Sequence, residues 1–138
     1  MLDFIQVQYG TADLMKNELK DILSLIAATV FADKHIFASE IDVFIKSTRN
    51  LKIVKRLEPK ISEAKLLSWY ELNKDEIQQN LSTPYFKDWF YAILERLNDV
   101  KDKESILDVM RKISRADGHI HVSERALIAL SENYWHTN

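Results

Sequence analysis

A nine-residue motif occurs twice in this 138-residue chain, and the two copies lie 84 positions apart. Residues 32–40 read Ala-Asp-Lys-His-Ile-Phe-Ala-Ser-Glu, and residues 116–124 read Ala-Asp-Gly-His-Ile-His-Val-Ser-Glu, so six of the nine positions are identical. Apolar positions on both sides of the motif match at the same offset. A helical hairpin has to bury its apolar faces, and a second copy is its natural partner. The repeat therefore predicts two related helix–loop–helix units, at about residues 13–57 and 98–135.

Apolar residues recur along the chain at steps of three and four, which is the spacing of an amphipathic helix. Helices are expected over residues 13–31, 39–57, 62–71, 73 onward, 84–98, 101–115 and 123–135. Ser39, with Asp42 three residues later, is predicted to cap the second of these helices, and Asn73 and Thr83 are predicted to cap the fourth and fifth. No segment has the pattern of a strand. We therefore predict one all-α domain over residues 1–138, with about seven helices and an internal duplication.

The chain has 2 glycines, 2 prolines and no cysteine, and this composition excludes several classes of site. Gly10 and Gly118 are too far apart to form a P-loop, a dinucleotide-binding fingerprint or a nucleophile elbow. Without cysteine the chain has no disulfide, no thiolate metal site and no thiol nucleophile. No spacing of serine, histidine and acid links a nucleophile to a base and an orienting group. We therefore expect a protein that is not an enzyme.

The pattern Ala-Asp-Gly-x-Ile-x-x-x-Glu, present twice between expected helices, resembles the TerB-like family of tellurite-resistance-associated proteins. The same pattern is similar to the N-terminal, membrane-proximal domain of some J-domain co-chaperones. The resemblance covers residues 13–135, and its first copy departs from the pattern because Lys34 replaces the glycine. It implies an all-helical duplicated fold, a stress-associated role and an acidic site able to bind a metal. The alternative that it leaves open is a metal-independent protein–protein interaction module of the co-chaperone type.

Each copy of the motif carries an Asp and a Glu seven positions apart. If the Asp follows one helix and the Glu lies in the first turn of the next, the hairpin brings two carboxylates together. Oxygen ligands of this kind suit Ca²⁺, Mg²⁺ or Mn²⁺, and the repeated histidines could add nitrogen ligands for Zn²⁺ or Mn²⁺. The candidate metal ligands are Asp33, Glu40, Asp117, Glu124, His35 and His119. The sequence leaves the identity of the divalent ion open.

The same carboxylates also have a purely structural interpretation. A loop Asp can accept hydrogen bonds from the backbone N–H groups of its own turn. Glu40 and Glu124, beside Ser39 and Ser123, place negative charge where a helix N-terminus favours it. Metal binding and capping both remain open from the residues alone.

Other features bear on partners and location. The formal net charge is −2, which gives no global field for nucleic acid or an anionic membrane. Basic residues from Lys46 to Lys60 form either a patch for an anionic partner or a solvated face. Tyr85 and Trp89, four positions apart, would suggest a protein partner if both were exposed. With no targeting signal and no transmembrane segment, we expect a cytoplasmic protein with a protein partner, no nucleic-acid partner and no membrane span.

Overall fold

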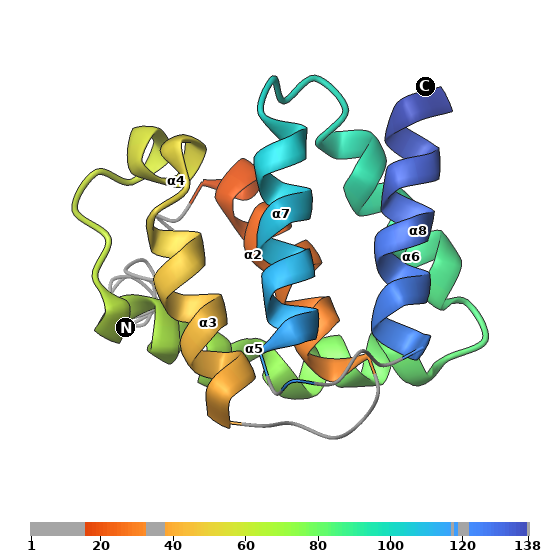
Figure 1. The fold of residues 1–138 in the computed structure, drawn as a ribbon, viewed down its shortest axis with the longest axis horizontal. Coiled ribbons are helices and arrows are strands. Elements are labelled where there is room, and N and C mark those ends of the chain that lie inside the picture. Colours follow the sequence, from red (N-terminus) through yellow and green to blue (C-terminus); the bar gives the residue numbers. More distant parts are fainter. Residues whose placement is uncertain (1–15, 33–37, 117, 119–121, 138) are drawn as a thin grey trace, which may run out of the picture.

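The computed structural model of this chain describes residues 16–32, 38–116, 118 and 122–137. These residues form seven α-helices and no strand, which confirms the predicted all-α fold (Figure 1). The helices are α2 (Asn17–Phe31), α3 (Ala38–Arg49), α4 (Lys52–Leu57), α5 (Glu63–Ser82), α6 (Phe86–Arg96), α7 (Lys103–Arg115) and α8 (Val122–Thr137). None of these helices combines the length and the apolar character that crossing a membrane requires.

The helix predicted over residues 39–57 is in fact two helices, because the chain breaks after α3. Leu51 has an extended backbone, with φ −63° and ψ 132°, and α4 begins directly after it. In an uninterrupted helix, Ile53 would point about 180° away from the buried ring of Phe44 and would face solvent. The break instead leaves Ile53 only 3% exposed, with Val54 fully buried beside it. Burial of these apolar side chains therefore accounts for a break that no glycine or proline marks.

The two helices predicted over residues 62–71 and from residue 73 are one helix, α5. It begins at a capping residue, Ser62, whose Oγ accepts a hydrogen bond from the backbone N–H of Lys65 at 3.1 Å. Asn73 is not a cap, because it lies inside the helix and its side-chain Nδ2 donates to the carbonyl of Trp69 at 2.8 Å. The buried stripe of α5 continues past Asn73 to Ile77. That continuity, rather than the presence of a capping residue type, decides the boundary.

Two other predicted helix starts are displaced. α3 begins at Ala38, so Ser39 is a helical residue rather than the cap, and Asp42 forms an exposed ion pair with Lys46 at 3.3 Å. Thr83 ends α5 instead of beginning α6, and its hydroxyl donates to the carbonyl of Asn80 at 3.1 Å. Both errors move a boundary by one to three residues and leave the helices in place.

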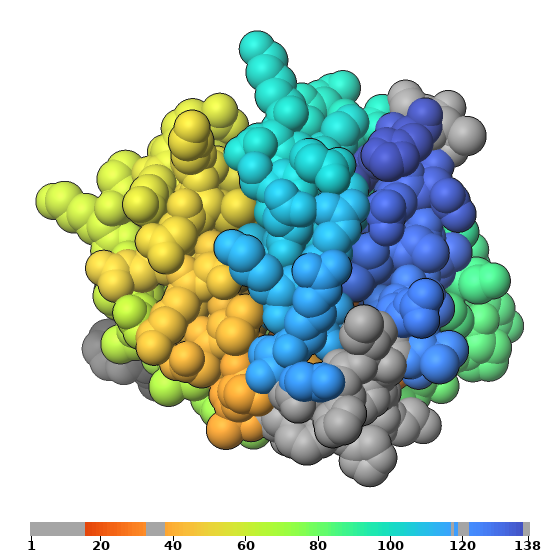
Figure 2. All heavy atoms as spheres, viewed as in Figure 1, coloured from red at the N-terminus to blue at the C-terminus, as the bar shows by residue number. Residues whose placement is uncertain are grey.

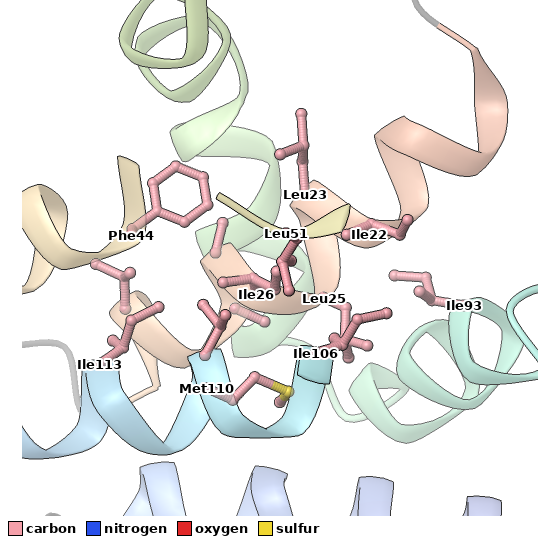
Figure 3. Close-up of a cluster of buried hydrophobic side chains, with 14 of the residues drawn as sticks. Ile22, Leu23, Leu25, Ile26, Phe44, Leu51, Ile93, Ile106, Met110 and Ile113 are labelled. Carbon is pink, nitrogen blue, oxygen red and sulfur yellow. The ribbon is translucent and has the colours of Figure 1, made fainter. Parts of the chain in front are cut away.

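α2 is the central helix of the fold. From Leu19 to Phe31 most of its side chains are buried, and the helix contacts α3, α5, α6, α7 and α8. Figure 3 shows Ile26 of α2 and Met110 of α7 in one apolar cluster, with Phe44 of α3 and Ile93 of α6 at its sides. α3, α7 and α8 lie next to one another across one face of the molecule (Figure 2).

The helix bounds agree with the 84-residue offset of the repeat. α2 ends at Phe31 and α7 ends at Arg115, while α3 begins at Ala38 and α8 begins at Val122. The matched apolar residues that precede the motif are buried in both units: Ile22, Leu23, Leu25 and Ile26 in one, and Ile106, Leu107, Val109 and Met110 in the other. The units contact each other through α2 and α7, α3 and α7, and α2 and α8. The two units therefore pack directly against each other.

Candidate functional site

The helix ends that flank the two motif copies gather on one side of the molecule. α2 and α7 end there, and α3 and α8 begin there, along the lower part of Figure 1. α5 passes along the same side and contacts both α2 and α3. The first turns of α3 and α8 have backbone N–H groups without partners inside the helix, so this side offers a positive electrostatic environment to carboxylates.

Glu40 and Glu124 are buried at equivalent positions on this side. Each lies in the first turn of its helix, as the motif predicted, and is the third helical residue; the exposed fractions of Glu40 and Glu124 are 1% and 0%. Both side chains have interaction partners within the protein. Burial of a carboxylate is unfavourable unless hydrogen bonds, an opposite charge or a metal compensates for the lost water. The two glutamates are therefore built into the fold rather than placed on its surface.

The burial of these glutamates is the feature that the sequence interpretation missed. A favourable charge at a helix N-terminus does not by itself imply that the side chain leaves water. The signal was present in the spacing, because Glu40 lies four residues before Phe44 and Glu124 lies four residues before Ile128. Phe44 and Ile128 are both buried, so each glutamate lies on the core-facing side of its helix.

The first glutamate lies in the electrostatic environment of a buried tyrosine. Burial, followed by the charges of Glu71 and then Glu40, raises the pKa of Tyr70 from its ordinary value of 10.0 to about 12. The Tyr70 ring stacks on Phe31 at the end of α2, with centroids 5.4 Å apart, and lies 5.9 Å from the ring of Phe44 in α3. Packing of these three aromatic rings thus joins α5 to the end of α2 and to α3, the two helices that flank the first copy of the motif.

The second copy contains a glycine with a backbone conformation that other residues rarely adopt. Gly118 has φ +82°, in the region that favours glycine because a Cβ meets steric resistance there. Its N–H donates to the carbonyl of Arg115 at 3.0 Å, which continues hydrogen bonding past the end of α7. Lys34 occupies the matching position of the first copy in the sequence and lies outside the described residues.

The structure describes two of the six predicted metal ligands, Glu40 and Glu124. Asp33, His35, Asp117 and His119 lie outside the described residues. Within the part of the chain that is described, no group of three or more His, Asp or Glu side chains is placed to hold a metal ion. The metal hypothesis therefore depends on the two buried carboxylates together with the spacing of the motif.

No family model, curated protein or solved structure matches this chain. Any assignment of function therefore has to come from its own residues and from the resemblance of the motif.

The structure also describes the basic and aromatic features that the sequence singled out. Because α3 and α4 are separate helices, the basic residues between Lys46 and Lys60 do not share the single helical arc that a continuous helix would give them. Of the predicted aromatic pair, only Tyr85 is well exposed, at 72%. Trp89 is half-buried and packs against the core, with its ring centroid 6.4 Å from that of Phe90.

A polar hollow that the sequence did not indicate lies between the start of α2 and the connection from α6 to α7. It has a volume of about 340 Å³ and is lined by Asn17, Glu18, Asp21, Arg96, Asp99 and Val100. The guanidinium of Arg96 donates to both carboxylate oxygens of Asp21, at 2.9 and 3.0 Å, which raises the pKa of Arg96. This bidentate pair holds α6 against α2, and it serves as a structural contact.

Proposed function

We propose that the chain is a non-catalytic, TerB-like, stress-associated protein that binds a divalent cation through its duplicated Asp…Glu motif. The observation that supports the proposal is the equal burial of Glu40 and Glu124 at equivalent positions of two hairpins. A residue needed only for charge at a helix N-terminus could perform that role while exposed to solvent. Burial in both copies is better explained by a site that both hairpins retain.

The charge balance of each copy favours a divalent cation. An Asp and a Glu together contribute two negative charges when ionised, and the helix N-terminus contributes the equivalent of about half a positive charge. In each copy the two carboxylates therefore carry more negative charge than the helix N-terminus alone offsets. A bound Ca²⁺, Mg²⁺, Mn²⁺ or Zn²⁺ ion would neutralise most of that charge, and the first three ions prefer oxygen ligands.

The link to tellurite resistance that the resemblance implies would have to be indirect. Binding or reduction of tellurite is chemistry for soft thiolate ligands, and this chain has no cysteine. The proposed role is therefore binding of a hard cation, and through it of a stress-related protein partner, rather than chemistry on the oxyanion.

Thermal unfolding of chelator-treated protein with each of the four ions tests the proposal. An ion present at 100 times its dissociation constant adds about 2.7 kcal/mol to the free energy of unfolding. For a domain of this size, that corresponds to a rise in Tm of about 10 °C. The rise should disappear in Asp117→Asn and Glu124→Gln. The control Glu76→Gln, which changes an exposed side chain outside the motif, should keep it.

The capping interpretation predicts a different result. In that case the variants lower the Tm of the metal-free protein, and no ion raises the Tm of the parent. Absence of a shift with all four ions would therefore overturn the metal proposal and reassign the carboxylates to hydrogen bonding within the hairpins.

A second candidate function is the metal-independent interaction module, and exposed apolar side chains favour it. Leu72 on α5 is 75% exposed and Tyr85 before α6 is 72% exposed. Exposed aromatic residues are common anchors in protein interfaces. Partner capture that survives chelation and is lost in Tyr85→Ala would support this alternative over the metal site.

A further inference from the structure

Positive charge is concentrated in one segment of an otherwise acidic chain. Residues 46–60 contain six basic residues and one acidic residue, which gives this segment a net charge of +5. The rest of the chain contains 13 basic and 20 acidic residues, which gives a net charge of −7. The overall charge of −2 therefore hides a strongly uneven distribution.

The acidic residues near this segment are already matched by other cations. Three acidic residues occur between positions 42 and 65, and each forms an ion pair. The pairs are Asp42 with Lys46 at 3.3 Å, Glu63 with Arg49 at 3.2 Å, and Glu58 with Lys65 at 3.9 Å. None of these carboxylates is paired with the cations of α4 or with Lys60.

Four exposed cations remain, and we call them the basic face: Lys52, Lys55, Arg56 and Lys60. Among the described residues no ion pair is found for any of them. The three cations on α4 fall within about 100° around the helix axis. The opposite side of α4 buries Ile53 and Val54, so the helix lies flat against the core and turns its charges outward.

We propose that the basic face docks on an anionic lipid bilayer, as a peripheral electrostatic contact. Each Lys or Arg near an anionic membrane contributes about 1 kcal/mol, which is about fivefold in affinity. Four such side chains together raise the affinity for the membrane about a thousandfold. An exposed ion pair with an acidic protein surface is weaker, and association with a single partner molecule also loses translational and rotational freedom.

The shape and composition of the basic face favour a lipid surface over nucleic acid. A six-residue helix packed flat against the core cannot enter a DNA groove. The segment from position 46 to position 60 contains no aromatic residue that could stack on bases. Three of the four cations are lysines, whose flexible point charges suit a diffuse anionic surface.

Vesicle co-sedimentation tests this proposal with the full chain. We expect binding to vesicles that contain phosphatidylserine and phosphatidylcholine, no binding to pure phosphatidylcholine, and loss of binding as salt increases. The double variant Lys55→Gln/Arg56→Gln should bind about 30-fold more weakly. The control Lys87→Gln/Lys112→Gln removes two exposed lysines from α6 and α7 and should bind like the parent.

Three outcomes would overturn the proposal. The first is equal binding to anionic and neutral vesicles, and the second is equal weakening by the two double variants. The third is that the parent protein binds duplex DNA but does not bind anionic vesicles. Circular dichroism of each variant establishes that it is folded, and the changed side chains are exposed, so loss of binding reports on charge.

Discussion

Replacing Tyr70 with Phe should make the free energy of unfolding less dependent on pH in the alkaline range. The Tyr70 side chain is 3% exposed, and burial, Glu71 and Glu40 raise its pKa from 10.0 to about 12. Because the pKa is higher in the folded state, the unfolded chain loses this proton first as pH rises. The stabilisation is therefore complete below pH 10 and is lost between pH 10 and pH 12.

The difference of about two pH units corresponds to about 2.7 kcal/mol when the transition is complete, and to about 2 kcal/mol at pH 11.5. Urea unfolding at pH 9 and pH 11.5 measures this change in the free energy of unfolding directly. The parent should lose about 2 kcal/mol more than Tyr70→Phe between the two pH values. The lysines titrate in both proteins, so their contribution cancels in the comparison. Tyr85→Phe, which removes an exposed hydroxyl, is the matched control and should behave like the parent.

The same experiment probes the candidate site, because Glu40 is one of the charges that raise the pKa of Tyr70. In Glu40→Gln, tyrosinate absorbance should show Tyr70 titrating at a lower pH than in the parent, whereas Glu76→Gln should leave it unchanged. The reasoning is refuted if parent and Tyr70→Phe lose equal stability on going to pH 11.5. It also fails if Glu40→Gln folds but does not move the titration.

Three further substitutions test the packing around this framework by urea unfolding. Gly118→Ala should lower the free energy of unfolding by about 1–2 kcal/mol because alanine is strained at this positive φ. An added Cβ would meet no atom within 4 Å, so a clash would not contribute. No loss of stability would mean that the φ is not positive in solution. Ser62→Ala should cost about 1 kcal/mol through loss of the α5 cap, whereas the exposed Ser68→Ala should cost much less. Ile26→Ala should cost about 2–5 kcal/mol, against less than about 0.5 kcal/mol for Leu72→Ala, and similar losses would contradict the central position of α2.

The helices themselves could be predicted from the sequence because their apolar spacing is regular, but two boundaries depended on tertiary packing. The predicted number of helices agrees with the seven found in the described part of the chain only because two errors cancel. A helix breaks at Leu51, and two predicted helices join through Asn73. At Leu51 the gain is burial of Ile53, and at Asn73 the polar side chain hydrogen bonds within the helix. Neither effect is visible in the local residue types.

The position of the candidate site along the chain could be predicted from the sequence, but the burial of its two glutamates could not. The repeat placed Glu40 and Glu124 in the first turns of two helices, where the structure has them. Their burial depends on how α3 and α8 are rotated against the core. Phe44 and Ile128, one turn further along, are buried on the same sides of these helices. A local capping interpretation considers only the helix end, so it misses this coupling.

The two copies of the motif differ at three of nine positions, and one of these differences, Lys34 against Gly118, predicts the stoichiometry of metal binding under the proposed function. In the first copy Lys34 adds a positive charge next to Asp33 in the sequence, whereas the second copy has Gly118 there. A neighbouring ammonium group opposes cation binding by electrostatic repulsion. We therefore expect calorimetry to give one tightly bound ion per chain, held by the second copy, and two in Lys34→Gly. Lys60→Gly, which removes an exposed lysine far from the motif in the sequence, should leave one ion. Two ions in the parent would mean that the carboxylates suffice regardless of this residue, and one ion in Lys34→Gly would mean that charge at this position does not distinguish the copies.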